Sequence, residues 1–266
     1  MSLKTDEAPE SAYGNKPVAD LSLAIPMHNS QEFLAELFAS IDAQSILPRE
    51  IIILDDASAD ASFSEAERLC SRYSWSCCTS LERSQVNLGV AGAYTRLVAR
   101  STCEWIQILD ADDALDPAFI AGLGLDSIPA EIVAVSGSAR CNRFAVNAAY
   151  RFFAALGPKR IPRWLPILGL LTTRSAIAYR RSSLLQVHFP NPAFDGSDIL
   201  HLLRLHDCGE IRFAPAAVVR YRIHDGSVSA GASSERYLSE LRLTSAGLLY
   251  RLDHFLRKRL FAFMRK

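Results

Sequence analysis

Three acidic side chains, Asp110, Asp112 and Asp113, directly follow an apolar stretch of the sequence. That stretch, Trp105 to Leu109, is typical of a strand that is buried on both faces in a parallel sheet. Carboxylates that follow such a strand lie at the edge where open α/β sheets bind ligands. Because their negative charges repel one another, a hard divalent cation that bridges to a phosphate is the simplest group that would neutralise them. A solvated acidic turn is the alternative when this stretch is taken alone.

A second acidic pair follows another strand. Glu50 to Leu54 has the apolar character of a buried strand and is followed by Asp55 and Asp56. Leu21 to Met27 predicts the first strand of the chain, and such strands alternate with helical patterns. This alternation predicts right-handed crossovers and a mostly parallel sheet. Because parallel strands end at one edge, we expect Asp56 and Asp112 to lie near each other.

Helical spacing of apolar residues separates these strands. Asn29 and Glu32 are spaced as a capping box, and a core-packing helical pattern follows them. Further helices are expected over Ser62 to Tyr73 and over roughly Ala91 to Arg100, with a short strand in Cys77 to Leu81 between them.

The second half of the chain is less regular. Short strands are expected over Glu131 to Val135, Ile177 to Arg181 and Ile211 to Phe213, and a helix over roughly Ser197 to Asp207. Prolines interrupt residues 158–166, which we predict to be irregular and exposed. The sequence therefore predicts an α/β protein.

The composition limits the class of protein. The chain has 266 residues, 49% of them hydrophobic, which is enough for a sizeable core. Lys plus Arg equals Asp plus Glu at 29 each, which argues against a general nucleic-acid surface. The six cysteines form no C-x-x-C pair, so we expect neither a zinc site nor a disulfide framework. Because the sequence shows no signal-peptide or transmembrane pattern, a soluble cytoplasmic protein is expected.

Short motifs are spread over residues 21–229 of the chain. They are IPMHN at 25–29, LDDASAD at 54–60, NLG at 87–89, LDADD at 109–113, SDILHLLRL at 197–205 and YRIHDGSVS at 221–229. In this order and at these distances they resemble the motifs of the inverting nucleotide-sugar glycosyltransferases of glycosyltransferase family 2. The resemblance implies the GT-A fold, a Rossmann-like, mostly parallel sheet flanked by helices. His28 stands where the family usually has Tyr.

The resemblance also divides the chain into segments. Residues 1–20 are expected to form a flexible tail. Residues 21–115 would form the nucleotide-sugar-binding half, and residues 116–230 the acceptor-binding half, of one GT-A domain. Residues 231–266 are expected to form a C-terminal amphipathic helical extension.

The acidic motif would serve the leaving group of the reaction. As the bond from the sugar to the diphosphate breaks, negative charge gathers on the diphosphate, and a metal held by carboxylates neutralises it. The resemblance implies that Asp112, Asp113 and His224 bind Mg²⁺ or Mn²⁺. It places Asp110 and Arg222 beside the nucleotide-sugar. A structural role is the alternative for His224, and pairing with a carboxylate is the alternative for Arg222.

The nucleotide pocket is implied at the other strand ends. Its nucleotide-sugar contacts, by resemblance, are Pro26, Asn29, Asp56, Asn87 and Gly89. Asp56 would accept a hydrogen bond from the base, which is uracil in a UDP-sugar. A simpler role is expected for Asp60, which we predict to cap the next helix.

Inversion at the sugar requires a base that takes the proton of the acceptor hydroxyl. The resemblance assigns this catalytic role to Asp198, and an N-cap of the helix that follows is the alternative. The Glu that the family usually has before this residue is Ser197 here, and Asp195 is a candidate substitute.

A second departure from the family concerns donor preference. The family often follows N-x-G with an A-R-N triplet whose Arg helps to hold the nucleotide, and here the triplet is Ala93, Tyr94 and Thr95. Arg96 comes two places later, a rotation of roughly 200° on a helix, and is no obvious replacement.

The end of the chain is basic and amphipathic. Lys and Arg interleave with Leu and Phe over residues 256–266. Such a helix can lie on an anionic membrane surface, which would place the protein peripherally at the inner face of the membrane. The alternative, which we favour, is packing against its own domain or against a second subunit of a homo-oligomer.

Together with these patterns, the resemblance implies a metal-dependent inverting glycosyltransferase of the hexosyl- or N-acetylhexosaminyltransferase type. It would move a sugar from a nucleotide-sugar, with a UDP-sugar favoured, to a hydroxyl of a glycan or lipid-linked glycan in cell-envelope polysaccharide biosynthesis. A haloacid-dehalogenase-type phosphatase is a weaker alternative, because its D-x-D motif would lie on the first strand. A nucleotide-sugar-binding protein without transferase activity is the other alternative, suggested by Tyr94 and Ser197.

Overall fold

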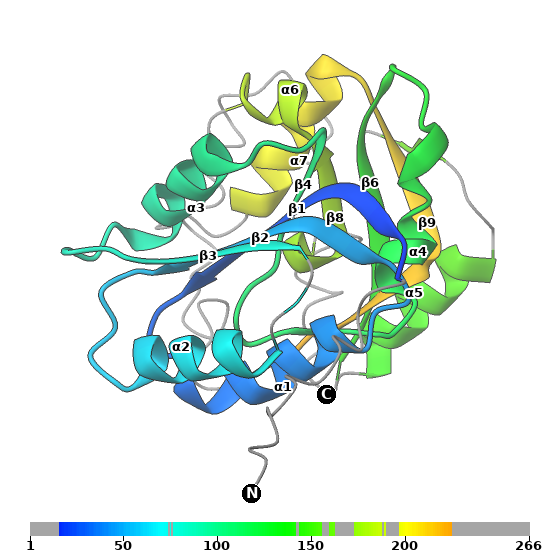
Figure 1. Cartoon of the computed structure of the whole chain (residues 1–266). Coiled ribbons are helices and arrows are strands. Elements are labelled where there is room, and N and C mark those ends of the chain that lie inside the picture. Colours follow the sequence, from blue (N-terminus) through cyan, green and yellow to red (C-terminus); the bar gives the residue numbers. More distant parts are fainter. Residues whose placement is uncertain are drawn as a thin grey trace, which may run out of the picture.

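The computed structural model of the protein describes residues 16–73, 75, 77–141, 144–155, 160–162, 173–187, 189 and 197–224. Helices cover both faces of one mixed sheet (Figure 1). The predicted extension at 231–266 and most of the predicted tail lie outside the described residues. Among the helices that are described, none is both long enough and apolar enough to cross a membrane.

The first half of the sheet is parallel, as the alternation of strands and helices predicted. Its strands lie in the order β3-β2-β1-β4, and each neighbouring pair is parallel. Their bounds are β1 Val18–Met27, β2 Leu47–Asp55, β3 Cys78–Arg83 and β4 Trp105–Ile108. The carboxyl ends of β2 and β4 therefore flank that of β1, and Asp56 and Asp112 follow strands that end at the same edge.

The helices of the first half divide between the two faces of the sheet. Helices α1 (Gln31–Asp42) and α2 (Ser62–Tyr73) cover one face, and α3 (Gly89–Arg100) covers the other (Figure 1). Side chains of β1 alternate accordingly, since Leu23 belongs to the cluster with α1 and α2 whereas Ala24 belongs to the cluster with α3. The strands are apolar on both faces because both faces are covered.

The second half of the sheet mixes strand directions. β8 (Ile177–Arg180) is antiparallel to β4, and β6 (Ile132–Arg140) is antiparallel to β8. β9 (Glu210–Arg220) is parallel to β6 and pairs in antiparallel fashion with β5 (Ala114–Leu115) and β7 (Arg160–Ile161). The other elements are α4 Phe119–Leu123, α5 Phe144–Ala155, α6 Arg181–Leu184, α7 Ser197–Cys208 and the 3-10 helices η1 Leu125–Ser127 and η3 Arg174–Ala176. Because β8 lies beside β4, η3 comes next to the acidic motif.

The predicted capping box at the start of α1 is wrong. The residue before the helix is Ser30, and it makes no side-chain capping bond. Asn29 has a positive φ of 50°, which Asn tolerates better than most residues. Its Oδ1 accepts a hydrogen bond from the backbone N–H of Ala59 at 2.8 Å. The Asn29 side chain therefore ties the end of β1 to the loop after β2 instead of capping its own helix.

Candidate active site

The Asp56 side chain, after β2, holds the loop that leads into α3. Its Oδ1 accepts a hydrogen bond from the backbone N–H of Leu88 at 2.7 Å, and its Oδ2 accepts one from Gly89 at 2.9 Å. The Asn87 side chain accepts from the same Gly89 N–H at 2.8 Å. Gly89 has a φ of 70°, which glycine adopts at little cost. Three of the predicted pocket residues thus lie together, and both Asp56 oxygens already accept hydrogen bonds.

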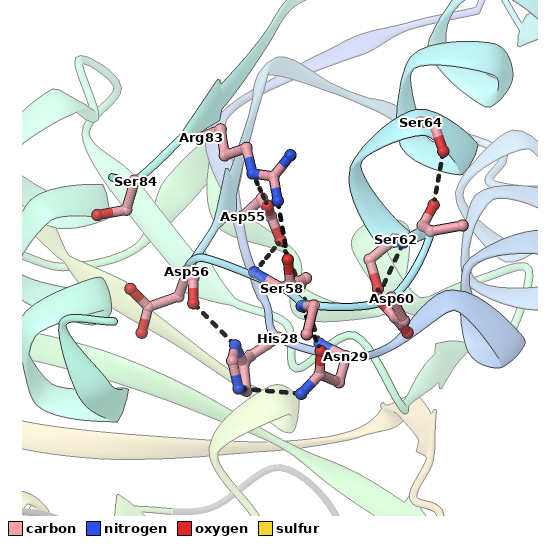
Figure 2. Close-up of polar contacts among 12 residues, drawn as sticks. His28, Asn29, Asp55, Asp56, Ser58, Asp60, Ser62, Ser64, Arg83 and Ser84 are labelled. Carbon is pink, nitrogen blue, oxygen red and sulfur yellow. Dashed lines mark hydrogen bonds and ion pairs between the residues drawn. The ribbon is translucent and has the colours of Figure 1, made fainter. Parts of the chain in front are cut away.

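His28 joins this group from the end of β1 (Figure 2). Its Nδ1 lies 2.8 Å from the Asp56 carbonyl oxygen, which can only accept, so Nδ1 carries the proton. Nε2 is then the acceptor for the side-chain amides of Asn29, at 3.1 Å, and Asn87, at 3.4 Å. All three side chains are exposed. They present a flat ring and amide groups at the sheet edge, a surface on which a nucleobase can stack and form hydrogen bonds.

Asp55, at the end of β2, and Asp60, in the loop before α2, hold the backbone through their carboxylates. Asp55 is fully buried; its Oδ1 accepts from the Ser58 N–H at 3.3 Å, and its Oδ2 pairs with an arginine of β3 at 3.1 Å (Figure 2). Asp60 accepts from the backbone N–H groups of Ser62, at 3.0 Å, and Gln31, at 3.3 Å. The predicted capping of α2 by Asp60 is therefore confirmed.

The acidic motif after β4 has fewer internal partners. Asp110 is half-buried, and its carboxylate accepts a hydrogen bond from the Tyr94 hydroxyl of α3 at 2.8 Å. Asp113 is only 2% exposed, and its Oδ1 accepts the backbone N–H of Arg222 at 2.9 Å. The other oxygen of Asp113 is buried without a hydrogen-bond partner among the described residues. Burying an incompletely paired carboxylate costs free energy, so this corner of the sheet favours a cation.

Asp112 faces His224, which follows β9. The Asp112 Oδ2 and the His224 Nε2 are 3.1 Å apart, and the side chains are 27% and 28% exposed. Phe33 of α1 packs against the imidazole, with ring centroids 4.8 Å apart. The structure thus brings two of the predicted metal ligands together, and both side chains remain accessible to a ligand.

Electrostatics show that negative charge is in excess around the acidic motif. Burial, followed by the charges of Asp110 and Asp112, raises the pKa of Asp113 to about 8. Burial also raises the pKa of Asp110, and the positive charge of Arg174 opposes that shift. Both shifts indicate that the local cations do not fully offset the carboxylates.

The donor set at this corner fits a magnesium or manganese ion. Carboxylate oxygens suit both ions. The second oxygen of Asp113 is buried without a hydrogen-bond partner among the described residues and is a candidate acceptor for a cation. Within the described residues, no three or more side chains gather as a metal-binding group. Mg²⁺ usually binds through one or two carboxylates together with substrate phosphates and water, so Asp112 with Asp113 would fit such a site. Metal binding by His224 stays a prediction.

Two other predicted site residues have internal contacts. The Arg222 guanidinium pairs with Glu36 of α1, and its central carbon lies 4.8 Å from the centre of the Phe33 ring. Of the two roles considered for Arg222, carboxylate pairing is the one that the structure shows, and contact with the donor stays a prediction. Pro26 is half-buried in β1, opposite Leu54 of β2.

The predicted base, Asp198, lies in the first turn of α7. The structure describes its backbone but not its side chain, and Asp195 lies outside the described residues. Its assignment as the base therefore stays a prediction, as does the alternative that it caps α7.

Two residues that the sequence did not assign, Arg174 and Ser175, complete the surroundings of Asp110. The central guanidinium carbon of Arg174 lies 4.5 Å from the centre of the Tyr94 ring. The Ser175 Oγ accepts the backbone N–H of Asp110 at 3.2 Å. Tyr94 carried a signal in the sequence, because it departs from the A-R-N triplet. Nothing in the local pattern indicated Arg174 or Ser175.

Solved structures share this fold. Staphylococcal TarS (S. aureus TarS 1-349), crystallised in complex with UDP-GlcNAc, matches with a TM-score of 0.65 and 16% identity over 84% of this chain and 64% of its own. Mannosyltransferase PcManGT from Pyrobaculum calidifontis, in complex with GDP-Man and Mn²⁺, matches with a TM-score of 0.60 and 18% identity over 85% of this chain and 62% of its own. At these identities the likeness shows the fold alone, which is the predicted GT-A fold.

Curated relatives match over shorter segments. A dolichol-phosphate mannosyltransferase of Pyrococcus furiosus is 32% identical over 104 residues, which is 39% of this chain and 28% of the relative. A cholesterol galactosyltransferase of Borreliella burgdorferi is 26% identical over 140 residues, which is 53% of this chain and 35% of the relative. The matched segments thus span about a third of each relative. The model of the family described as glycosyl transferase family 2 matches residues 22–187, and this chain is therefore a member of that family.

Proposed function

We propose that this protein transfers a sugar, with inversion, from a nucleotide-sugar to a hydroxyl group of a glycan or lipid-linked glycan. The observation that carries the proposal is the pairing of Asp112 with His224 at the sheet edge that also carries Asp56. A group that binds at this edge would meet a neutral, flat surface on one side of β1 and a corner that favours cations on the other. A nucleotide diphosphate with a divalent cation has this division of chemistry.

The nucleoside end of the donor would occupy the surface around His28. There the ring is held by the Asp56 carbonyl oxygen, and the amides of Asn29 and Asn87 approach its other nitrogen. Because these contacts are already formed, the side chains have little conformational freedom left to lose when a base binds. Asp56 would act mainly by holding the Gly89 turn, and hydrogen bonding to the base would use its remaining acceptor capacity.

The diphosphate end would lie at Asp112 and His224. When bound, Mg²⁺ or Mn²⁺ would offset the charge that gathers on the diphosphate. The chain's own residues hold this end in place: Phe33 orients the imidazole, and the Arg222 N–H fixes Asp113.

The transfer step requires proton movement on the acceptor side. The acceptor hydroxyl oxygen forms a bond to the anomeric carbon while the bond from that carbon to the diphosphate oxygen breaks. The hydroxyl proton moves to a carboxylate oxygen of Asp198, and the bonding electrons leave with the diphosphate. Attack on the face opposite the leaving group inverts the configuration at the anomeric carbon.

The fold neighbours support a nucleotide-sugar donor, since TarS was crystallised with UDP-GlcNAc and PcManGT with GDP-Man and Mn²⁺. We favour a UDP-sugar because Asp56 stands where the family resemblance places the uracil acceptor. The named relatives act on dolichol phosphate and cholesterol, which supports a lipid-linked acceptor. Contact with a membrane through the basic C-terminal segment stays a prediction.

The test is to replace Asp198 with Asn and to separate donor binding from transfer. We expect Asp198→Asn to bind UDP-N-acetylglucosamine or GDP-mannose as the wild type does, while release of the nucleotide in the presence of a glycan acceptor falls by roughly 10²- to 10⁴-fold. Asp207→Asn, at an exposed position of the same helix, is the matched control and should transfer at the wild-type rate. Wild-type transfer by Asp198→Asn would refute the base assignment. Donor binding without any transfer by the wild type would favour the binding-protein alternative.

A further inference from the structure

The loop before β8 holds Asp110 through two consecutive residues. The Ser175 Oγ accepts the Asp110 backbone N–H at 3.2 Å, which fixes the main chain of the acidic motif. Arg174 lies over the Tyr94 ring at 4.5 Å, and the Tyr94 hydroxyl is 2.8 Å from the Asp110 Oδ1. The main chain and the side chain of Asp110 are therefore both oriented from η3, although η3 is more than sixty residues away in the sequence.

The η3 turn is itself held firmly against β4. Gln107 of β4 donates its side-chain amide to the Ser175 carbonyl oxygen at 2.6 Å, and both of these residues are buried. Directly after η3, Ala178 of β8 pairs with Gln107 in the sheet. A loop with these contacts keeps one geometry, so Arg174 and Ser175 present a fixed frame to Asp110.

The charges around the acidic motif make Arg174 distinctive. Arg222 is paired with Glu36, and Arg220 is paired with Glu36 and Asp116. Arg174 instead has Tyr94 and Asp110 as electrostatic partners, and these raise its pKa against the opposing effect of burial. Its planar guanidinium can stack on the Tyr94 ring, which an ammonium group cannot do in the same way.

We propose that Arg174 is a positioning residue for the donor. Through the Tyr94 ring and hydroxyl, it holds one oxygen of Asp110 and leaves the other to accept a hydrogen bond from a sugar hydroxyl of the nucleotide-sugar. That hydroxyl belongs either to the ribose or to the transferred sugar. This inference rests on the proposed function and adds to it the Arg174–Tyr94–Asp110 connection as a determinant of donor binding.

The experiment compares donor affinity in variants that break this connection at two points. Tyr94→Phe removes only the hydroxyl, and Arg174→Gln removes the guanidinium. The probes are UDP-N-acetylglucosamine and GDP-mannose with Mn²⁺, and their parent nucleotides UDP and GDP. Each variant should weaken binding of the nucleotide-sugar about tenfold or more, the loss typical of a hydrogen bond to a charged group. The double variant should lose little more than either single variant, because both act on the same carboxylate.

A matched control lies at the far end of β8, the strand that follows η3. Arg180 stacks over Trp105 with the same 4.5 Å separation but pairs with Glu104 and contacts backbone carbonyl oxygens. Arg180→Gln removes a comparable stacked guanidinium from β8 and should leave donor affinity within about twofold of the wild type. Thermal unfolding of all variants separates a general loss of stability from a specific loss of donor affinity.

The outcomes are distinguishable from those of the proposed function. Weaker binding of both the nucleotide-sugar and the parent nucleotide supports contact with the ribose, and weaker binding of the nucleotide-sugar alone supports contact with the transferred sugar. Unchanged affinity in folded Tyr94→Phe and Arg174→Gln overturns the inference and leaves the proposed function standing. A wild type that binds neither nucleotide-sugar overturns both.

Discussion

Two groups of residues flank β1 at one edge of the sheet, and they differ in how their carboxylate oxygens are paired. The Asp56 corner, after β2, consists of His28, Asn29, Asp56, Asn87 and Gly89. The Asp112 corner, after β4, consists of Asp110, Asp112, Asp113 and His224. At the Asp56 corner, both carboxylate oxygens accept backbone N–H groups. At the Asp112 corner, a carboxylate oxygen is buried without a partner among the described residues.

This difference indicates what each corner can bind. The Asp56 corner completes its own hydrogen bonds and offers a preformed surface, which suits a neutral planar group. At the Asp112 corner the carboxylates crowd together, and the raised pKa of Asp113 reflects this crowding, which a bound cation or a proton would relieve. We therefore expect this sheet edge to offer a preformed surface beside a corner that a bound cation would complete.

Asparagine substitutions should separate the corners by the sign of their effect on stability, measured by thermal unfolding without divalent ions. Asp56→Asn should lower the free energy of unfolding by about 2 kcal/mol, because an amide cannot accept both backbone N–H groups. Asp113→Asn should leave the free energy of unfolding unchanged or raise it, because it removes a buried carboxyl group that is costly to keep either charged or protonated. The amide still offers an oxygen to the Arg222 N–H. A shift of this size corresponds to several degrees in Tm.

An equal fall in Tm for both substitutions would contradict this contrast, because the carboxylates of the Asp112 corner would then be as well paired as Asp56. Asp126→Asn, on η1 and exposed, is a control for the loss of one carboxylate and should change Tm little.

A separate effect, from His201, adds to any difference between the two corners when stability is measured in acid. His201 of α7 is 1% exposed, and burial lowers its pKa from 6.5 to about 3. Because the unfolded chain binds this proton more readily, stability is full above about pH 6.5 and falls as the pH drops towards about 3. At pH 5 protonation of His201 in the unfolded chain lowers the free energy of unfolding by about 2 kcal/mol. Any carboxylates that titrate in this range add their own contribution.

His201→Phe should flatten the dependence of stability on pH over that window, measured by chemical denaturation at pH 7 and pH 5. The rings of Tyr179 and Phe189 pack against His201, so a phenyl ring of similar shape can keep these contacts. If the variant loses as much free energy of unfolding between pH 7 and pH 5 as the wild type does, the acid sensitivity arises from other groups.

The sequence could predict features that depend only on residues close together in the chain. The apolar run before Asp110 and the one before Asp55 placed both acidic groups correctly after strands, and the capping role of Asp60 depends on a neighbour two residues away. Element boundaries were less predictable: β9 extends over Glu210–Arg220, well beyond the predicted Ile211–Phe213, because Pro215 and small residues interrupt the apolar pattern while the strand still pairs with β6.

Contacts between distant segments could not be predicted in this way. Asn29 resembled a capping residue, but its partner is Ala59, which only the packing of β1 beside β2 brings into reach. Arg174 and Ser175 lie in a stretch without periodicity, and their contacts with Tyr94 and Asp110 exist only because β8 lies beside β4. Local pattern indicated the candidate side chains, whereas sheet topology determines which groups surround them.

We expect the Asp112 corner to hold a divalent ion that supports donor binding. Calorimetric titration of a nucleotide-sugar, UDP-N-acetylglucosamine or GDP-mannose, into wild type and Asp112→Asn, each with Mn²⁺ and with a chelator, tests it most directly. We expect Mn²⁺ to tighten binding by about tenfold or more in the wild type and to have little effect in Asp112→Asn. Equal affinity with Mn²⁺ and with chelator in the wild type would contradict the claim.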